Sequence, residues 1–211
     1  MASEYQEEWE QQRMEAISDL AENMIYRIPG CDSVTVRKTL QAVYAEFCRE
    51  STCLRSHLRI PMKKDIAVYP IPALYGGYVD SVQGVVISPF EQNYGLDYTV
   101  DDGVPVCVRL VHPPSDMAKN LTLEVFTIEM PMPNTETAPR GIIGRYGQFI
   151  VNGVMERLLS MNGRMWYDAA AAQYEHKKYV DGIGSVRQKM LSGGQAGSGR
   201  VSAMNYDNVI I

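Results

Sequence analysis

Residues 139–191 decide the fold, and they read PRGIIGRYGQFIVNGVMERLLSMNGRMWYDAAAAQYEHKKYVDGIGSVRQKML. Apolar side chains recur here at the spacing of an α-helix, which gathers them on one face. Asn162-Gly163 is a typical helix end, and Asp168 can cap a second helix. The stretch therefore predicts two helices. Their apolar sides contain Ile142, Ile143, Tyr146, Phe149, Ile150, Gly153, Val154 and Leu158 in the first, and Ala172, His176, Tyr179, Val180, Ile183, Val186 and Met190 in the second.

Three glycines interrupt the first of these helices, at Gly144, Gly147 and Gly153. Glycine lowers the intrinsic stability of a helix, because the unfolded chain has more backbone freedom to lose. We therefore expect a neighbouring element to approach closely at these three positions.

The first third of the chain also predicts two helices. Ser3 followed by Gln6 resembles a capping box, and helical spacing continues to the stop at Pro29-Gly30. Asp32 or Ser33 can cap the next helix, which is expected to end near Ser51. The apolar stripes contain Met14, Ile17, Leu20, Ala21, Met24, Ile25 and Ile28 in the first helix, and Val36, Leu40, Val43, Tyr44 and Phe47 in the second.

The middle third is predicted to be β. Prolines recur from Pro61 to Pro139 and forbid long helices, while β-branched runs lie between them. We expect strands near 55–60, 65–71, 79–88, 96–100, 104–111 and 120–130. Asp101-Asp102-Gly103 suits a tight hairpin turn, because Asp-Gly accepts a positive φ. Alternation predicts that the next strand buries Val104, Val106, Val108 and Leu110 on one face.

These patterns together predict an α+β fold. It is expected to be mainly a helical bundle, with an N-terminal helical hairpin, a C-terminal helix pair, an inserted antiparallel β domain and an extended C-terminal tail. The expected boundaries are 1–53 and 139–191 for the two parts of the helical domain, 54–138 for the β-rich insert and 192–211 for the tail.

The predicted tail begins with the linker-like sequence Ser192 to Gly199, which contains four glycines. An apolar segment follows it, and we expect that segment to dock on a partner or a neighbouring subunit. The predicted binding residues are Arg200, Val201, Met204, Tyr206, Val209, Ile210 and Ile211.

The sequence contains no complete motif for nucleotide binding, catalysis or metal binding. Gly194 and Gly199 have phosphate-loop spacing, but Arg200 and Val201 stand where that motif needs Lys and then Ser or Thr. His57, His112 and His176 fall in three different structural contexts, and the cysteines Cys31, Cys48, Cys53 and Cys107 form no Cys-x-x-Cys pair. We expect no catalytic residues, no metal and no cofactor, and we expect the cysteines to be small buried hydrophobes.

Charge is uneven along the chain, whose net charge is −5. Residues 1–27 hold seven acidic and two basic side chains, whereas residues 139–191 hold four and eight. Subunits that pack an acidic face on a basic neighbour would have this asymmetry, and so would ordinary solvated helix faces. The acidic balance argues against sequence-independent nucleic-acid binding. No apolar run is long enough to predict a membrane span or a signal peptide, so we expect the protein to stay in the compartment where it is made.

The order of elements, and three stretches within it, resemble one known family. The stretches are Ala42–Ser51, which leads from a helix directly into a strand, Val111–Leu123, which forms a loop and the following strand, and Tyr146–Arg187. In the last of these, a glycine-studded helix ends at Met161-Asn162-Gly163 and an alanine-rich helix opens after Trp166-Tyr167-Asp168. The pattern resembles the head-to-tail adaptor (connector) proteins of tailed bacteriophages over roughly residues 30–190. Residues 69–98 match no pattern of that family.

The resemblance implies a structural virion protein at the head-tail junction, assembled in the host cytoplasm, and not an enzyme. Such adaptors form a homo-oligomeric, commonly dodecameric ring that joins the portal protein to the tail or nozzle protein during tail assembly and genome packaging. The helical domain would lie beneath the portal, the tail segment would embrace it, and the β domain would face the tail or nozzle. Genome DNA would pass through the channel without sequence-specific contact.

Two alternatives remain at this point. The first is a neck or tail-completion protein of a long-tailed phage. The second, from another class, is a small-molecule binding protein or enzyme that uses the aromatic-rich insert, with Tyr69, Tyr75, Tyr78, Phe90, Tyr94 and Tyr98. Packing of these rings in the core and in subunit interfaces is the competing explanation for them.

Overall fold

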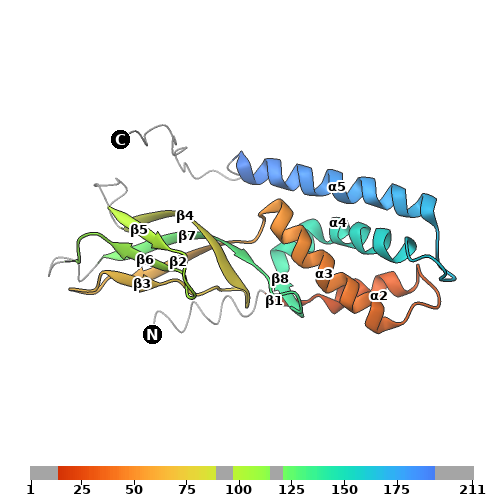
Figure 1. Ribbon diagram of the computed structural model, residues 1–211, viewed down its shortest axis with the longest axis horizontal. Helices are drawn as coiled ribbons and strands as arrows, with labels where there is room; N and C mark the ends of the chain where they lie inside the picture. The colour runs from red at the N-terminus through yellow and green to blue at the C-terminus, as the bar shows by residue number, and fades with distance from the viewer. Residues whose placement is uncertain (1–13, 89–96, 115–120, 193–211) are drawn as a thin grey trace.

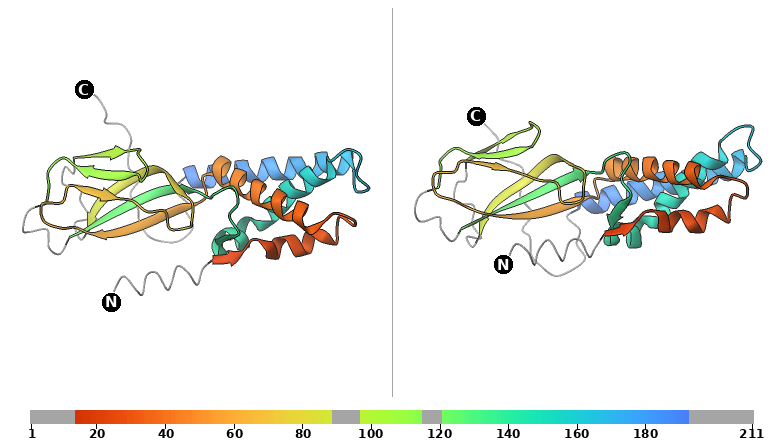
Figure 2. Two further views of the ribbon diagram at one scale, coloured as in Figure 1. Left: turned by 60° about the horizontal axis from the view of Figure 1, so that its bottom comes forward. Right: turned by 90° about the horizontal axis from the view of Figure 1, so that it is seen from below.

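The computed structural model describes residues 14–88, 97–114 and 121–192. Within these ranges the chain is an α+β fold with four helices and three antiparallel sheets. The helices gather at one end of the long axis, and the two three-stranded sheets lie at the other end (Figures 1 and 2).

The helices are α2 (Ser18–Ile25), α3 (Ser33–Ser51), α4 (Arg140–Leu159) and α5 (Ala169–Leu191). The strands are β1 (Met14–Ala16), β2 (Arg55–Pro61), β3 (Val68–Pro70), β4 (Tyr78–Ser88), β5 (Tyr98–Asp101), β6 (Cys107–Leu110), β7 (Thr122–Met130) and β8 (Thr137–Pro139).

Two predicted helix caps are confirmed. The Asp32 carboxylate accepts a hydrogen bond from the Thr35 backbone N–H at 2.8 Å, and the hydrogen bond from the Thr35 hydroxyl lowers the pKa of Asp32 further than this backbone bond does. The Asp168 carboxylate accepts from the Ala171 N–H at 2.9 Å. Each carboxylate satisfies an N–H that has no acceptor within its own helix, so α3 and α5 begin where the sequence predicts. Gly163, with φ of 78°, follows the end of α4.

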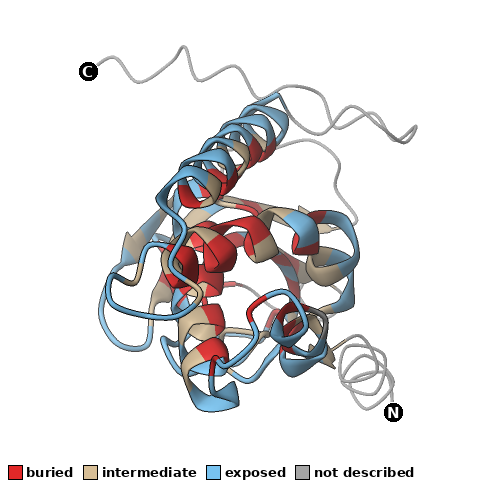
Figure 3. Cartoon of the chain, turned by 90° about the vertical axis from the view of Figure 1, so that its right-hand side faces the viewer, coloured by how far each residue is buried: buried red, intermediate tan, exposed pale blue. Residues whose placement is uncertain are grey.

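The helices enclose one hydrophobic core. The predicted stripe of α3 is buried throughout, and α4 buries Tyr146, Ile150, Val154 and Leu158 against it. Figure 3 shows the buried residues gathered on the inward sides of the helices, with exposed residues on their outer sides.

The buried face of α5 differs from the predicted one. Its buried positions are Ala172, Glu175, Tyr179, Gly182 and Val186. His176 and Val180, which were expected on the apolar side, are exposed. The physical reason is close helix packing: a Cβ on Gly182 would lie 2.5 Å from the Phe149 ring, so α5 turns its smallest side chain toward α4.

The first predicted helix is wrong in its extent. Its first residues lie outside the described part of the chain, and Met14–Ala16 form a strand that pairs with Thr137–Pro139. The helix begins only at Ser18 and ends at Ile25, whose side chain is exposed. A partner 123 residues away in the sequence supplies backbone hydrogen bonds to Met14–Ala16, and this pairing overrides the local helical pattern.

The six predicted strands all form, with shorter bounds in places. Strand β7 lies between β2 and β4 in one sheet, and β6 lies between β3 and β5 in the other. Their inward residues form a second hydrophobic core, which includes Leu58, Tyr69, Val85, Val108, Leu123 and Val125. The chain passes from the helical core into this second core directly after α3 and returns through β8 into α4.

The prediction of a tight hairpin turn at Asp101-Asp102-Gly103 is wrong. Asp101 pairs with Cys107, so five residues connect β5 to β6, and Gly103 does not have a positive φ. The Asp101 carboxylate accepts from the Gly103 N–H at 3.3 Å, which fits a role in the loop. Val104 is fully exposed in that loop, while Val108 and Leu110 are buried as predicted.

Close approach is confirmed at two of the three predicted glycines of α4. A Cβ on Gly153 would lie 2.7 Å from the Tyr179 ring and 2.8 Å from Val43, and one on Gly147 would lie 3.2 Å from Leu20. The expectation for Gly144 is wrong, because nothing lies within 4 Å of its Cβ position.

These glycines provide a matched pair of variants within one helix. Gly153→Ala should lower the free energy of unfolding by about 1–3 kcal/mol, because two buried side chains must move. Gly144→Ala should raise it by about 0.5–1 kcal/mol, because alanine restricts the unfolded chain and meets no neighbour. Urea denaturation followed by circular dichroism measures both. Equal effects of the two substitutions would contradict the packing described here.

Candidate functional site

The three histidines do not form a common site. His57 on β2 lies 3.1 Å from a Glu124 carboxylate oxygen and stacks on the Phe126 ring, with centroids 4.4 Å apart. His176 on α5 lies 3.0 Å from Glu156, and His112 is exposed after β6. The structure therefore does not bring any two of these histidines together. We still predict that each can be replaced without loss of a specific chemistry.

Two of the four cysteines lie in contact. Cys48 at the end of α3 and Cys53 before β2 have Sγ atoms 4.0 Å apart, and both thiols are free and buried. The contact with Cys53, together with burial, raises the pKa of Cys48 well above its ordinary value, so this thiol stays protonated at neutral pH. In the described ranges no group of three or more His, Cys, Asp and Glu side chains could hold a metal ion.

The most unusual ionisable group is Glu129 on β7, which the sequence analysis does not single out. Its side chain is fully buried. The carboxylate accepts hydrogen bonds from the Ser56 hydroxyl, from the Leu74 N–H at 3.0 and 3.1 Å and from the Tyr75 N–H at 3.1 Å. Two of these donors are backbone N–H groups of the segment before β4, and the third is a side chain of β2. Glu129 therefore anchors the segment before β4 to the sheet.

The signal for Glu129 is present in the sequence. Leu123, Val125 and Thr127 alternate toward the interior of β7, and Glu129 occupies the next inward position. A charged residue in an inward register requires partners, because a buried charge without them is too costly. The sequence could have indicated the anchor, but not which backbone N–H groups it binds.

Those aromatic residues of the insert that the structure describes do not converge on one cavity. Tyr69 is buried in the β core, Tyr75 packs against the helical core, and the exposed Tyr78 opens β4. Tyr98 is half-buried on β5, and Phe90 and Tyr94 lie outside the described residues. The predicted binding residues of the tail, Arg200 to Ile211, also lie outside them.

One candidate interaction surface lies at the far end of the helices. We call it the helical-end surface, and it consists of Tyr26, Met165, Tyr167 and Tyr174. Tyr26 is 87% exposed and Met165 is 94% exposed. The loops after α2 and α4 touch where Trp166 lies 4.0 Å from the Cβ position of Gly30. Exposed apolar side chains held on adjacent, fixed loops are typical of protein-binding surfaces.

An ion pair fixes this end of the molecule. The Arg27 guanidinium lies 3.0 Å from the Glu175 carboxylate, whose side chain is only 7% exposed. Lys178 adds a second positive charge at 3.8 Å from the same carboxylate. The loop after α2 is thereby tied to α5 next to Tyr26 and Tyr174.

A second candidate surface is a groove of about 700 Å³ at the β end. We call it the β groove. It is lined by residues of β2, of β3, of the segments that flank β3 and of the β5–β6 connection: His57, Leu58, Arg59, Ile60, Pro61, Lys63, Ile66, Val68, Tyr69, Pro70, Pro72, Leu74 and Pro105. Strands β2 and β3 are each at the edge of their sheet, so one side of each lacks a pairing strand within the described residues. The lining is largely apolar with basic groups among it, which suits an extended protein segment.

No protein-family model and no curated protein matches the chain. In the described part of the chain, no helix has the length and apolar character needed to cross a membrane.

The role of Glu129 as an anchor can be measured. Glu129→Ala should lower the free energy of unfolding by about 3–5 kcal/mol, because the Ser56, Leu74 and Tyr75 donors lose their acceptor in the interior. Glu129→Gln should cost about 1–3 kcal/mol, because the amide keeps one acceptor oxygen. Urea denaturation is the measurement.

The matched control is Glu124 on the same strand, whose carboxylate pairs with the more exposed His57 and Arg59 side chains. Glu124→Gln should cost less than about 1 kcal/mol, as surface ion pairs do. A Glu129→Ala variant as stable as this control would show that the carboxylate is not the anchor.

Proposed function

We propose that the chain is a structural adaptor of a tailed-phage head-to-tail junction that assembles into a ring between the portal and the tail or nozzle. The observation that carries this proposal is the position of the two candidate surfaces. The elements that carry the helical-end surface and those that carry the β groove lie in opposite halves of the long axis and have separate hydrophobic cores (Figure 1). A protein that joins two different partners needs two such surfaces.

The resemblance assigns an orientation to the ring. The helical part, with the N-terminal helices, the α4–α5 pair and the extended tail, is proposed to meet the portal, and the β part the tail or nozzle protein. The proposed ring is dodecameric. Its net acidic subunits repel the phosphates of the DNA that passes through the channel, which suits passage without specific contact.

The charges of the helical part support contacts between neighbouring subunits. Asp19 and Glu22 are exposed on α2, and Lys177, Arg187 and Lys189 are exposed on α5, where Asp181 is the one exposed acidic residue. These two helices lie on opposite sides of the helical end (Figures 1 and 3). An acidic face on one side and a basic face on the other suit a heterologous contact, the kind that closes a ring.

The first experiment is native mass spectrometry of the full chain, alone and mixed with the portal protein of the same virus. Rings of a single copy number, formed alone or on the portal, are expected. A chain that stays monomeric in both conditions would contradict the proposed function.

Charge reversal tests the proposed ring contact. Lys177→Glu, Arg187→Glu and Lys189→Glu together should weaken the contact by about tenfold or more, because attraction becomes repulsion. Asp19→Lys with Glu22→Lys in the same chain should restore it, and high salt should weaken the wild-type ring. Native mass spectrometry measures ring and monomer. If the second pair of substitutions does not rescue assembly, α2 is not the partner of α5.

The tail is proposed to contribute to portal binding more than to folding. Each ordered residue costs about 1–2 kcal/mol of backbone entropy, and burial of Val209, Ile210 and Ile211 on a partner would offset part of that cost. Deletion of residues 192–211 should leave the melting temperature unchanged and should weaken capture by immobilised portal. A lower melting temperature with intact capture would reverse this assignment.

A further inference from the structure

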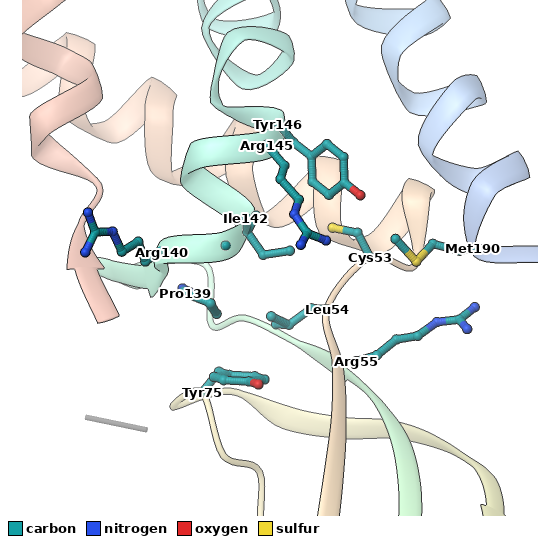
Figure 4. Close-up of a pocket in the computed structure, with 11 residues that line it drawn as sticks. Cys53, Leu54, Arg55, Tyr75, Pro139, Arg140, Ile142, Arg145, Tyr146 and Met190 are labelled. Atoms are coloured by element: carbon teal, nitrogen blue, oxygen red, sulfur yellow. The ribbon is translucent and has the colours of Figure 1, made fainter. Parts of the chain in front are cut away.

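A third feature lies where the helical part meets the β part. It is a cleft of about 460 Å³, which we call the junction cleft (Figure 4). Its walls come from the first turns of α4, from the connection between α3 and β2, from the segment that Glu129 anchors and from the end of α5. Gly141 and Arg145 in the wall are exposed, so the cleft opens to solvent.

A buried hydroxyl without a partner faces this cleft. Tyr146 is 6% exposed, and its Oη atom has no hydrogen-bond partner among the described residues. Figure 4 shows the hydroxyl directed toward the space between Arg145, Cys53 and Met190. Buried hydroxyl groups are almost always paired, because an unpaired one loses its bonds to water without compensation. The Tyr146 hydroxyl is therefore available to donate a hydrogen bond to a bound group.

One positively charged side chain lies beside this hydroxyl. The Arg145 guanidinium makes no ion pair within the described residues and is turned into the cleft beside Tyr146 (Figure 4). Arg140 differs, because it points away from the cleft and lies 3.1 Å from Glu15. Helix α4 also begins here, and its N-cap residue Pro139 supplies no side-chain acceptor for the first N–H groups. The start of a helix favours negative charge at this point.

The rest of the wall is apolar. Leu54, Ile142 and Met190 contribute aliphatic or thioether surface, and Tyr75 contributes an aromatic ring. The volume falls within the range of ordinary small-molecule sites, which combine apolar walls with a few convergent polar groups. A free anion such as phosphate would leave these walls uncovered, so the chemistry favours an anion attached to an apolar body.

We propose that the junction cleft binds a small amphiphilic anion, with its acidic group on Arg145, on the Tyr146 hydroxyl and at the start of α4. Its apolar body covers Leu54, Ile142 and Met190. The cleft joins the two hydrophobic cores, because Tyr75 packs on the helical core while the neighbouring Leu74 packs on the β core. A ligand here would stiffen the connection between the two ends. This inference does not rest on the adaptor proposal.

The probe is 8-anilinonaphthalene-1-sulfonate, an aromatic anion, titrated into the full chain while its fluorescence is followed. Saturable binding with one site per chain is expected. The carboxylate 3-phenylpropanoate should displace the probe, and its uncharged amide should not. Displacement by both compounds alike would show an apolar surface without anion recognition, and would overturn the proposal.

Variants place the probe in the cleft. Arg145→Gln should weaken binding by about tenfold or more, because it removes a charge-assisted hydrogen bond. Tyr146→Phe should weaken it by about two- to tenfold without lowering the melting temperature of the ligand-free chain, because the hydroxyl it removes is unpaired there. Arg187→Gln on the exposed side of α5 is the matched control and should bind as the wild type does.

The two measurements on Tyr146→Phe separate a ligand-binding role from a structural one. A lower melting temperature with unchanged probe affinity would mean that the hydroxyl supports the fold and not a ligand. Wild-type affinity in a chain with both Arg145→Gln and Tyr146→Phe would place the probe elsewhere, for example in the β groove, and would overturn the proposal.

Discussion

The hydrogen bonds to the buried Glu129 side chain hold in place the segment that packs against both the helical half and the β half. The carboxylate holds the backbone of Leu74 and Tyr75, and these adjacent residues belong to different cores. Leu74 also lines the β groove, and Tyr75 lines the junction cleft. One buried side chain thus holds the backbone of residues that line two concave surfaces. The Ser56 hydroxyl is a third donor to the same carboxylate, which ties the start of β2 to the anchor as well.

The helical half depends on a different constraint, the close approach of α4 to its neighbours. At Gly153 and Gly182 the facing side chains occupy the space of a missing Cβ, so α3, α4 and α5 pack with little freedom to shift. This packing aligns the loops that present the helical-end surface, and the Arg27–Glu175 ion pair ties them together. Rigid loops lose less entropy when a partner binds them, which supports the proposal that this end is a binding surface.

Much of the secondary structure was predictable from local patterns. The caps at Asp32 and Asp168 and the end of α4 near Gly163 were correct, because capping is decided by residues within a turn of one another. Two of the errors, the extent of the first helix and the buried face of α5, have one cause in common. Met14–Ala16 became a strand through pairing with Thr137–Pro139, and His176 became exposed because α4 selected Gly182 as the contact point on α5. Each error required a distant partner that a local pattern cannot contain.

The sequence by itself determined the α+β class, the positions of the long helices and the β character of the middle third, because apolar spacing follows directly from backbone geometry. Only the tertiary structure decided where polar groups are left without partners and where they find them. Glu129 meets Ser56 and Leu74 although more than fifty residues separate it from each of them. Arg145 and Tyr146 face a cleft whose other walls come from the α3–β2 connection, the segment before β4 and the end of α5. Whether a buried hydroxyl or carboxylate is satisfied depends on atoms within about 3 Å, and those neighbours are chosen by the packing of the whole chain.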